Sequence, residues 1–201
     1  MKKLLAGLVL VFGVANIASA AGDAAAGQDK VAVCAGCHGA DGNSVMANFP
    51  KLAGLGEKYL LKQMNDIKAG KRVVIEMTGL LDAMTEQDLA DVAAYYDAKV
   101  IAAGVAPADA VEKGQALYRG GSLAKSIPAC SACHAPNGAG YEQAGFPALA
   151  GQHAAYVEAQ LVKFRSGDRS NDGDARIMRD IAAKLSDVEI KALSGYISGL
   201  R

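Results

Sequence analysis

Large aromatic side chains are scarce in this sequence of 201 residues, which has no tryptophan and only 5% aromatic residues. The chain nevertheless contains 51% hydrophobic residues, so we expect a folded globular protein whose core has few large groups to fill it. Charge of one sign is also missing, because 21 basic residues balance 21 acidic ones. Without a concentrated basic face, nucleic acid is not expected as a partner.

A hydrophobic run long enough to span a membrane is absent as well. Residues 4–17 form an apolar stretch of about 14 residues, whereas a spanning helix needs roughly 20. The basic start Met1-Lys2-Lys3 and the small residues Ala18-Ser19-Ala20 instead match a secretory signal peptide. We expect residues 1–20 to be cleaved near Ala20 and the protein to be exported to the periplasm. No cysteine lies near this position, which argues against a lipoprotein anchor.

An internal repeat organises the rest of the chain. Three segments occur twice in the same order, at an offset that drifts only from 96 to 101: CAGCH (34–38) and CSACH (130–134), FPKLAG (49–54) and FPALAG (146–151), TEQDLADVAAYY (85–96) and SDVEIKALSGYI (186–197). Such a pattern indicates a duplicated domain. We expect domains at residues 21–103 and 104–201, joined by an Ala/Gly/Pro-rich linker at about 98–108.

Each copy is predicted to be helical. Tyr59, Leu60, Met64 and Ile67 share one helix face, and no alternating strand pattern competes with this interpretation. Short helices are expected over residues 24–35 and 109–118, before the cysteine pairs, and the copies also share two small features. These are Gly27-Gln28 echoed by Gly114-Gln115, and helix-start patterns at Thr85-x-x-Asp88 and Ser186-x-x-Glu189. The predicted fold class is therefore all-α.

Nearly all cysteines and histidines lie in the two copies of one pentapeptide. C-x-x-C-H is the attachment pattern of c-type haem. Cys34 and Cys37, on one helical turn, can form thioethers to the two vinyl groups of a haem, and the adjacent His38 can ligate its iron. The second copy has the same set: Cys130, Cys133 and His134. The sequence therefore predicts two covalently bound haem c groups.

Paired cysteines also occur in structural zinc sites, in thiol–disulfide redox proteins and in structural disulfides. A separation of 96 residues is far outside common zinc modules, and such a site would leave both histidines unused. A thiol redox pair would be expected within an alternating β/α pattern, which is missing. Two C-x-x-C-H copies behind an export signal favour haem over all three alternatives.

The second axial ligand of each iron is predicted from the repeat, with methionine as the natural candidate. Met178 is the only methionine after residue 84, and subtracting the offset of 101 gives Met77. Met77 precedes Thr85 by eight residues, as Met178 precedes Ser186 by eight. The iron of each haem would then be closed on both sides.

Other candidate ligands fit the repeat less well. Met84 and Met64 correspond to leucines in the second copy and are interpreted as core residues. His153 falls opposite Gly56 and is interpreted as a surface loop histidine. Pro50 and Pro147 follow the motif histidines by 12 and 13 residues, so their carbonyls are candidates to accept the second imidazole N–H. The alternative for these prolines is a rigid loop turn.

With these motifs, the mature chain resembles the cytochrome c4 family. The resemblance is carried by the repeated FPKLAG and FPALAG loops, EMTG around Met77, IMR around Met178 and PACSACHAPNG. It implies two class I cytochrome c domains related by an approximate two-fold axis, with the haems near the interface. The family's haem-binding residues map onto eight positions: Cys34, Cys37, His38, Met77, Cys130, Cys133, His134 and Met178.

The resemblance also implies a periplasmic electron carrier between a quinol-oxidising cytochrome complex (a quinol–cytochrome c oxidoreductase) and a terminal oxidase. Loose peripheral association with a membrane is compatible with this role, and we expect a monomer. A carrier with two closed irons is not an enzyme. The alternatives are a di-haem peroxidase, which needs an open iron, and a haem subunit dedicated to one dehydrogenase complex.

Overall fold

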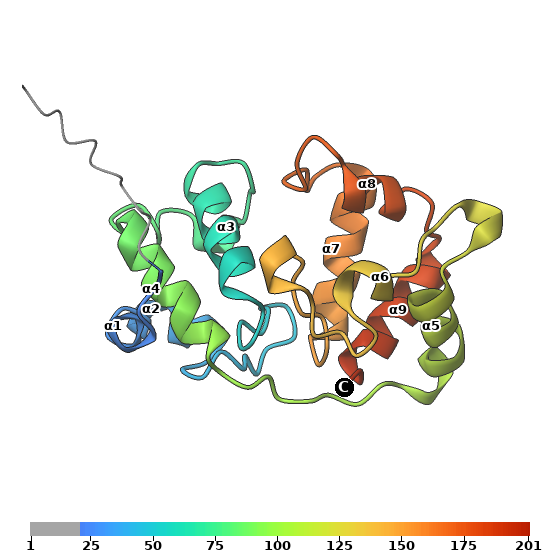
Figure 1. The fold of residues 1–201 in the computed structure, drawn as a ribbon, viewed down its shortest axis with the longest axis horizontal. Coiled ribbons are helices and arrows are strands. Elements are labelled where there is room, and N and C mark those ends of the chain that lie inside the picture. The colour runs from blue at the N-terminus through green and yellow to red at the C-terminus, as the bar shows by residue number, and fades with distance from the viewer. Residues whose placement is uncertain (1–20) are drawn as a thin grey trace, which may run out of the picture.

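The computed structural model describes residues 21–201, and the predicted signal peptide, residues 1–20, lies outside this part (Figure 1). The described part contains no β-strand, only the isolated bridges Ser122–Ile127 and Tyr141–Phe146, so the all-α prediction is confirmed. The α-helices follow in chain order: α1 (Ala24–Gln28), α2 (Ala32–His38), α3 (Glu57–Lys68), α4 (Glu86–Asp97), α5 (Ala108–Gly120), α6 (Ser131–His134), α7 (Ala154–Ser166), α8 (Ile177–Ala182) and α9 (Asp187–Ser198). Short 3-10 helices add η1 (Ile75–Met77), η2 (Leu123–Lys125) and η3 (Glu142–Ala144).

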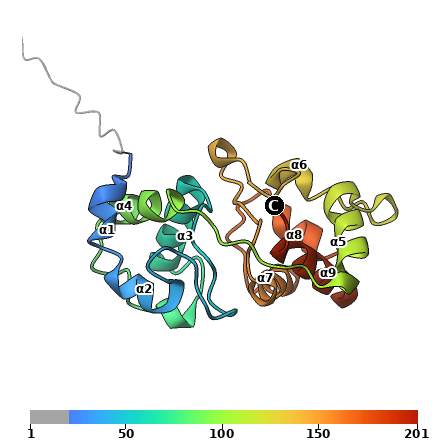
Figure 2. The same cartoon turned by 90° about the horizontal axis from the view of Figure 1, so that it is seen from below.

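The helices form two halves that lie side by side. Figure 1 shows α1–α4 on one side of the molecule and α5–α9 on the other. Residues 98–107 connect them and run along one edge of both halves (Figures 1 and 2). In each half the last helix packs against the first helix and against the long helix after the FP-x-LAG loop, as α4 does against α1 and α3. The duplicated sequence therefore produces duplicated packing.

The first and last helices of each half approach closely at a glycine. A Cβ on Gly27 of α1 would lie 2.1 Å from the carbonyl oxygen of Asp91 in α4. A Cβ on Gly114 of α5 would lie 2.4 Å from the carbonyl oxygen of Ala192 in α9. The sequence echo between these two glycines thus marks the same helix crossing, which only a residue without a side chain permits.

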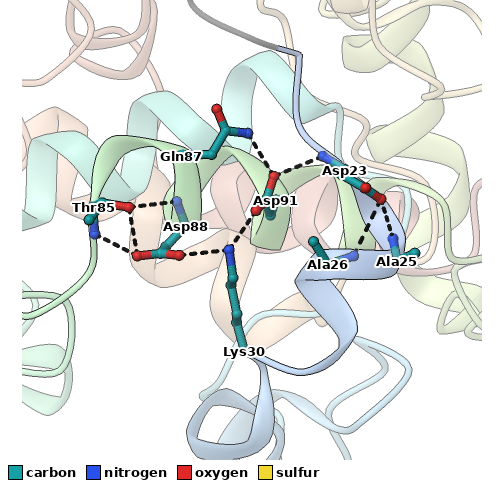
Figure 3. A network of polar contacts seen from close by, with 8 residues as sticks. All are labelled: Asp23, Ala25, Ala26, Lys30, Thr85, Gln87, Asp88 and Asp91. Atoms are coloured by element: carbon teal, nitrogen blue, oxygen red, sulfur yellow. Dashed lines mark hydrogen bonds and ion pairs between the residues drawn. The ribbon is translucent and has the colours of Figure 1, made fainter.

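A polar network holds the start of the described chain against α4 (Figure 3). The Lys30 ammonium lies 2.6 Å from the Asp88 carboxylate and 2.5 Å from that of Asp91. The backbone N–H of Asp23, the N-cap of α1, donates to Asp91 at 2.9 Å. This amide and the Lys30 ammonium hold the pKa of Asp91 below its ordinary value, so the network keeps its charge at neutral pH.

Both predicted capping boxes are present. At the start of α4 the Thr85 hydroxyl accepts from the backbone N–H of Asp88, and the backbone N–H of Thr85 donates to the Asp88 carboxylate. Ser186 and Glu189 make the same pair of hydrogen bonds at the start of α9. Lys125, together with the Ser186 backbone, lowers the pKa of Glu189 to about 2. Each last helix therefore begins at a defined residue, and this fixes which of its faces is turned to the core.

The single helix predicted over residues 24–35 is wrong. The structure divides this segment into α1, which ends at Gln28, and α2, which begins at Ala32. The intervening turn lets Lys30 reach α4 while Val31, only 5% exposed, enters the core of the first half.

Each half has its own hydrophobic core, with a cysteine of the C-x-x-C-H motif packed at its edge. The first core consists of Val31, Leu55, Leu60, Val92, Ala93, Tyr95 and Tyr96, with Cys34 against it. Ala148 of the second half completes this cluster, so the first core extends across the interface. The second core consists of Leu117, Tyr118, Ile127, Val157, Leu185, Ile190, Leu193, Tyr196, Ile197 and Leu200, with Cys130 against it.

Gly114→Ala is expected to lower the free energy of unfolding by about 1–3 kcal/mol, because the added methyl group must push α5 away from α9. Denaturant unfolding of the haem-loaded protein measures this. Gly120→Ala in the same helix is the matched control, since a Cβ there meets nothing within 4 Å. Equal losses in the two variants would show that the crossing does not depend on the glycine.

Candidate haem-binding sites

The two C-x-x-C-H motifs lie on short helices, each of which ends at the motif histidine. In α2, Cys34 and Cys37 are separated by about one turn and are half-buried, and His38 ends the helix with only 7% exposure. In the second half, Cys130 is the N-cap of α6 and His134 ends that helix at 8% exposure. Two thiols and one buried imidazole are therefore grouped at the same position of each half.

The imidazole rings are oriented by backbone carbonyls. The Nδ1 of His38 lies 2.9 Å from the carbonyl oxygen of Pro50, and the Nδ1 of His134 lies 2.9 Å from that of Pro147. Because a carbonyl only accepts, Nδ1 is the protonated nitrogen and Nε2 keeps a free lone pair. Burial lowers the pKa of both histidines, more than these hydrogen bonds raise it, so the neutral ring that a metal requires is favoured.

The residue after each histidine reverses the chain in a conformation with positive φ. Gly39 has φ 81° and ψ 148°, and Ala135 has φ 65° and ψ 154°. This region is nearly restricted to glycine, so Ala135 is strained at a cost of about 1–3 kcal/mol. The fully buried Tyr118 donates to the Ala135 carbonyl at 2.7 Å and helps to hold the turn.

A cavity of about 360 Å³ adjoins the first motif. Its lining includes Cys34, Cys37, His38 and Met77, together with apolar residues of α3, α4 and the 49–55 loop. Met84 is not among the lining residues and packs against the first core instead. The structure thus brings the predicted methionine to the same cavity as the thiols and the imidazole.

Met178 lies in the first turn of α8, where a charged loop binds the next residue, Arg179. The carboxylate of Asp172 accepts from the backbone N–H of Arg179 at 2.9 Å and from its guanidinium at 2.6 Å. The Asp172 side chain is only 6% exposed, so this ion pair is largely shielded from water. The longer loop of the second half therefore fixes the residue next to Met178, whereas Met77 ends the short 3-10 helix η1.

A polar cluster joins the halves beside this cavity. We define the interface cluster as three pairs at the offset of 97: Tyr59 and Tyr156, Gln63 and Gln160, Arg72 and Arg169. Its contacts are reciprocal. Arg72 donates to the hydroxyl of Tyr156 at 2.9 Å, and Arg169 donates to that of Tyr59 at 3.1 Å.

The glutamines of the interface cluster accept from both arginines. The amide oxygen of Gln63 lies 2.9 Å from Arg72 and 3.0 Å from Arg169. That of Gln160 lies 2.9 Å from Arg169 and 3.4 Å from Arg72. The sequence analysis missed this cluster, although the shared offset of the two arginines was a usable signal.

Both guanidinium groups lack an acidic partner within residues 21–201. Neither Arg72 nor Arg169 takes part in a salt bridge there, although Arg169 is only 7% exposed. Burial opposes ionisation of Tyr59, yet the charges of Arg169 and Arg72 outweigh it and lower the Tyr59 pKa. Asp66 acts on Arg72 only from beyond ion-pair distance, so these largely buried positive charges are costly and suit an anionic ligand. All six residues line the cavity, so the two propionate carboxylates of a haem fit this wall.

The first cysteine of each motif, Cys34 or Cys130, is a thiol shielded from water. All four are free, so neither pair forms a disulfide in the described chain. Burial raises the pKa of the Cys34 thiol, and it raises that of Cys130 to about 11. Thiols of this kind are not the low-pKa thiolates of disulfide oxidoreductases. Within the described range, no three His, Cys, Asp or Glu side chains gather as a metal cluster.

The surface-loop interpretation of His153 is wrong. This histidine is half-buried at the start of α7, and its Nε2 lies 2.9 Å from both the hydroxyl and the carbonyl oxygen of Ser44 in the other half. It therefore links the two halves. The sequence alone could not show this, because the contact joins residues 109 positions apart.

Known proteins place these features in a family. A family model described as "Cytochrome c" matches twice, at residues 24–97 and 111–201. Cytochrome c4 of Pseudomonas aeruginosa is 60% identical over 200 residues, covering 100% of both chains. The crystal structure of reduced recombinant cytochrome c4 from Pseudomonas stutzeri has a TM-score of 0.89 and 57% identity, covering 90% of this chain and 100% of that one. A more distant relative, named thiosulfate dehydrogenase electron acceptor in Stutzerimonas stutzeri, is 38% identical over 83% of this chain and 78% of its own length.

The fold and the paired motifs define a two-domain c-type cytochrome that binds two covalent haem c groups. The chain belongs to the cytochrome c4 family. It is an electron-transfer protein and not an enzyme, and its partners are redox proteins. None of the helices between residues 21 and 201 combines the length and apolar character needed to cross a bilayer.

Arg169→Gln and Arg72→Gln should each lower the reduction potential of the nearer haem by tens of millivolts, because a nearby positive charge favours the reduced iron. A spectroelectrochemical redox titration measures both potentials. Arg165→Gln is the matched control. It removes a charge from the same helix as Tyr156, but its guanidinium binds Asp187 and the Leu185 carbonyl, away from the cavity. A control shift as large as that of Arg169→Gln would contradict a specific field of the interface cluster.

Proposed function

We propose that eight residues hold the two haems and that both irons are closed. The proposed attachment residues are Cys34 and Cys37 in the first domain and Cys130 and Cys133 in the second. The proposed axial ligands are His38 with Met77 and His134 with Met178. The proposed domains are residues 21–103 and 104–201. The observation that carries this assignment is the cavity lined by Cys34, Cys37, His38 and Met77 together, and the equivalent residues of the second domain follow from the repeat.

The packing of the other methionines of the first domain supports the choice of Met77 as the ligand. Met84 packs against the first core and is separate from the cavity. Met64 does line the cavity, but it also packs against that core, and its counterpart in the second copy is Leu161. Met77 and Met178 are half-buried and belong to neither core cluster, which leaves their thioethers available.

When bound, haem provides an iron that gains and loses one electron. The residues of the chain do the rest. The neutral imidazoles of His38 and His134 and the methionine sulfurs of Met77 and Met178 would hold each iron on both sides, which would leave no position for peroxide or oxygen. The proline carbonyls hold the rings at Nδ1, and this makes Nε2 a more basic ligand. The di-haem peroxidase alternative is not favoured, because it needs an open iron.

The interface cluster supports passage of electrons between the two domains. Its arginines lie on the wall that the first cavity shares with the second domain, including Tyr156 and Gln160. Hydrogen bonds from Arg72 to Tyr156 and from Arg169 to Tyr59 link the two domains reciprocally and fix the geometry of this wall. A rigid, positively charged interface lowers the reorganisation that accompanies each change of charge. Two linked one-electron sites in one chain suit a carrier.

Met178→Ala should open the second iron, making it high-spin and able to bind carbon monoxide, while the first haem keeps its spectrum. Met77→Ala should do the reverse. Absorption and electron paramagnetic resonance spectra of the exported protein measure both outcomes. Met84→Leu is the control for the first domain and should leave both irons closed. An open first iron in Met84→Leu, together with a closed one in Met77→Ala, would contradict the assignment.

We further infer that the protein is a periplasmic monomer that carries electrons from a quinol–cytochrome c oxidoreductase to a terminal oxidase. The apparent signal peptide at residues 1–20 supports export, and full-length cytochrome c4 relatives at 56–60% identity support a general carrier. A second candidate is an acceptor subunit dedicated to one dehydrogenase. It is supported by the relatives named thiosulfate dehydrogenase electron acceptor, which are 34% and 38% identical.

Oxidation by isolated membranes distinguishes these two routes. The reduced protein should be oxidised by membranes that contain a terminal oxidase, and the oxidised protein should be reduced by quinol in the presence of the quinol–cytochrome c oxidoreductase. A stopped-flow absorbance trace follows both steps. Reduction by a thiosulfate dehydrogenase alone, with no turnover by either membrane complex, would contradict the respiratory route and favour the dedicated subunit.

A further inference from the structure

One peptide group connects the first haem site to the second domain. The carbonyl oxygen of Pro50, which accepts from Nδ1 of His38 at 2.9 Å, belongs to the same planar unit as the N–H of Lys51. That N–H donates to the side-chain oxygen of Gln152 at 2.9 Å in a buried contact. Gln152 of the second domain therefore binds the N–H side of the same peptide group whose carbonyl orients His38 of the first domain.

The contact is a built feature of the interface. Gln152 is only 3% exposed, and its amide nitrogen donates back to the Lys51 carbonyl at 2.9 Å, so the two residues are joined by a pair of hydrogen bonds. The Lys51 side chain, 7% exposed, adds contacts to the carbonyls of Ala102 at 2.6 Å and Gly151 at 2.9 Å. These bonds fix the peptide relative to both the linker and the second domain.

The second domain has the same arrangement in a weaker form. Pro147 accepts from His134, and the next N–H, that of Ala148, donates to the backbone carbonyl of Leu55 in the first domain at 3.3 Å. Leu55 and Gln152 occupy equivalent positions at the offset of 97. The Lys51 N–H of the first domain thus donates over a shorter distance to a side-chain oxygen, and the Ala148 N–H of the second domain donates over a longer distance to a backbone oxygen.

We propose that Gln152 is a positioning residue for His38 and that it lowers the reduction potential of the first haem. An acceptor on the Lys51 N–H polarises the peptide and makes the Pro50 oxygen a stronger acceptor, since linked hydrogen bonds reinforce one another. The stronger acceptor draws the Nδ1 proton and makes the imidazole a more basic ligand, which favours the oxidised iron. This inference rests on the proposed role of His38 as an axial ligand.

Gln152→Leu tests the proposal, because leucine is the residue at the equivalent position of the first domain. At a fixed ambient potential, the reduced-to-oxidised ratio of the first haem should rise by about twofold or more, with the second haem unchanged. The proton resonance of His38 Nδ1–H should move toward that of a weaker hydrogen bond. The opposite change is expected for Gln152→Glu, whose carboxylate keeps and strengthens the acceptor on Lys51.

Lys58→Met is the matched control, since it removes an exposed hydrogen bond to the Gln143 carbonyl of the second domain and does not involve residues 49–51. If Lys58→Met raises the reduced-to-oxidised ratio of the first haem as much as Gln152→Leu, or if the His38 resonance stays in place in both Gln152 variants, the proposal is wrong. Gln152→Glu keeps the test decisive should the leucine variant fail to fold. A spectrum of the unsubstituted protein separates the role of Gln152 from the ligand assignment. If the His38 ring protons there lack the large resonance shifts of an iron ligand, the assignment of His38 as an axial ligand is overturned instead.

Discussion

Each domain depends on one hydrogen bond, from Nδ1 of the motif histidine to a proline carbonyl, 2.9 Å long in both domains. It orients the ring, holds its proton on one nitrogen and leaves the other free for iron. It also ties the short helix that carries the cysteines to the loop at residues 49–54 or 146–151. Because Lys51 and Ala148 of these loops also bind the opposite domain, the geometry of each haem site is coupled to part of the interface.

Duplication explains both the similarity of the sites and their differences. The offset of 97 persists from Phe49 to Arg72, so the interface cluster forms from equivalent residues that meet reciprocally. The offset becomes 101 before Met178, where the second copy has four more residues. These residues carry the Asp172–Arg179 ion pair and let Asn171 bind Asp66 of the first domain. The second methionine loop is therefore tied down by charge, and the first is short and more apolar.

The cofactor could be predicted because its attachment pattern is local and repeated. The C-x-x-C-H spacing indicates haem c, whereas the choice of Met77 over Met84, which follows from the lone Met178 and the repeat offset, stays a prediction. The capping boxes were readable for the same reason. The Gln152–Lys51 pair and the His153–Ser44 contact could not be predicted, since each joins residues about 100 positions apart and depends on how two folded domains meet. The interface cluster left one signal in the sequence, the shared offset of Arg72 and Arg169, but its contacts also depend on how the domains meet. The break after α1 was not predicted because it depends on contacts with α4, which is distant in sequence, and not on neighbouring residues.

A chain without tryptophan can make two stable small domains because haem fills part of each core. Each core stops at a cysteine of the motif, and a covalently held macrocycle replaces the missing aromatic side chains. The central claim is that both irons are closed and move electrons only. The most direct test is a spectroscopic redox titration of the native exported protein with and without carbon monoxide. Two one-electron transitions from low-spin haems, unchanged by carbon monoxide, are predicted, and a haem that is high-spin or binds carbon monoxide in the native protein would contradict the account.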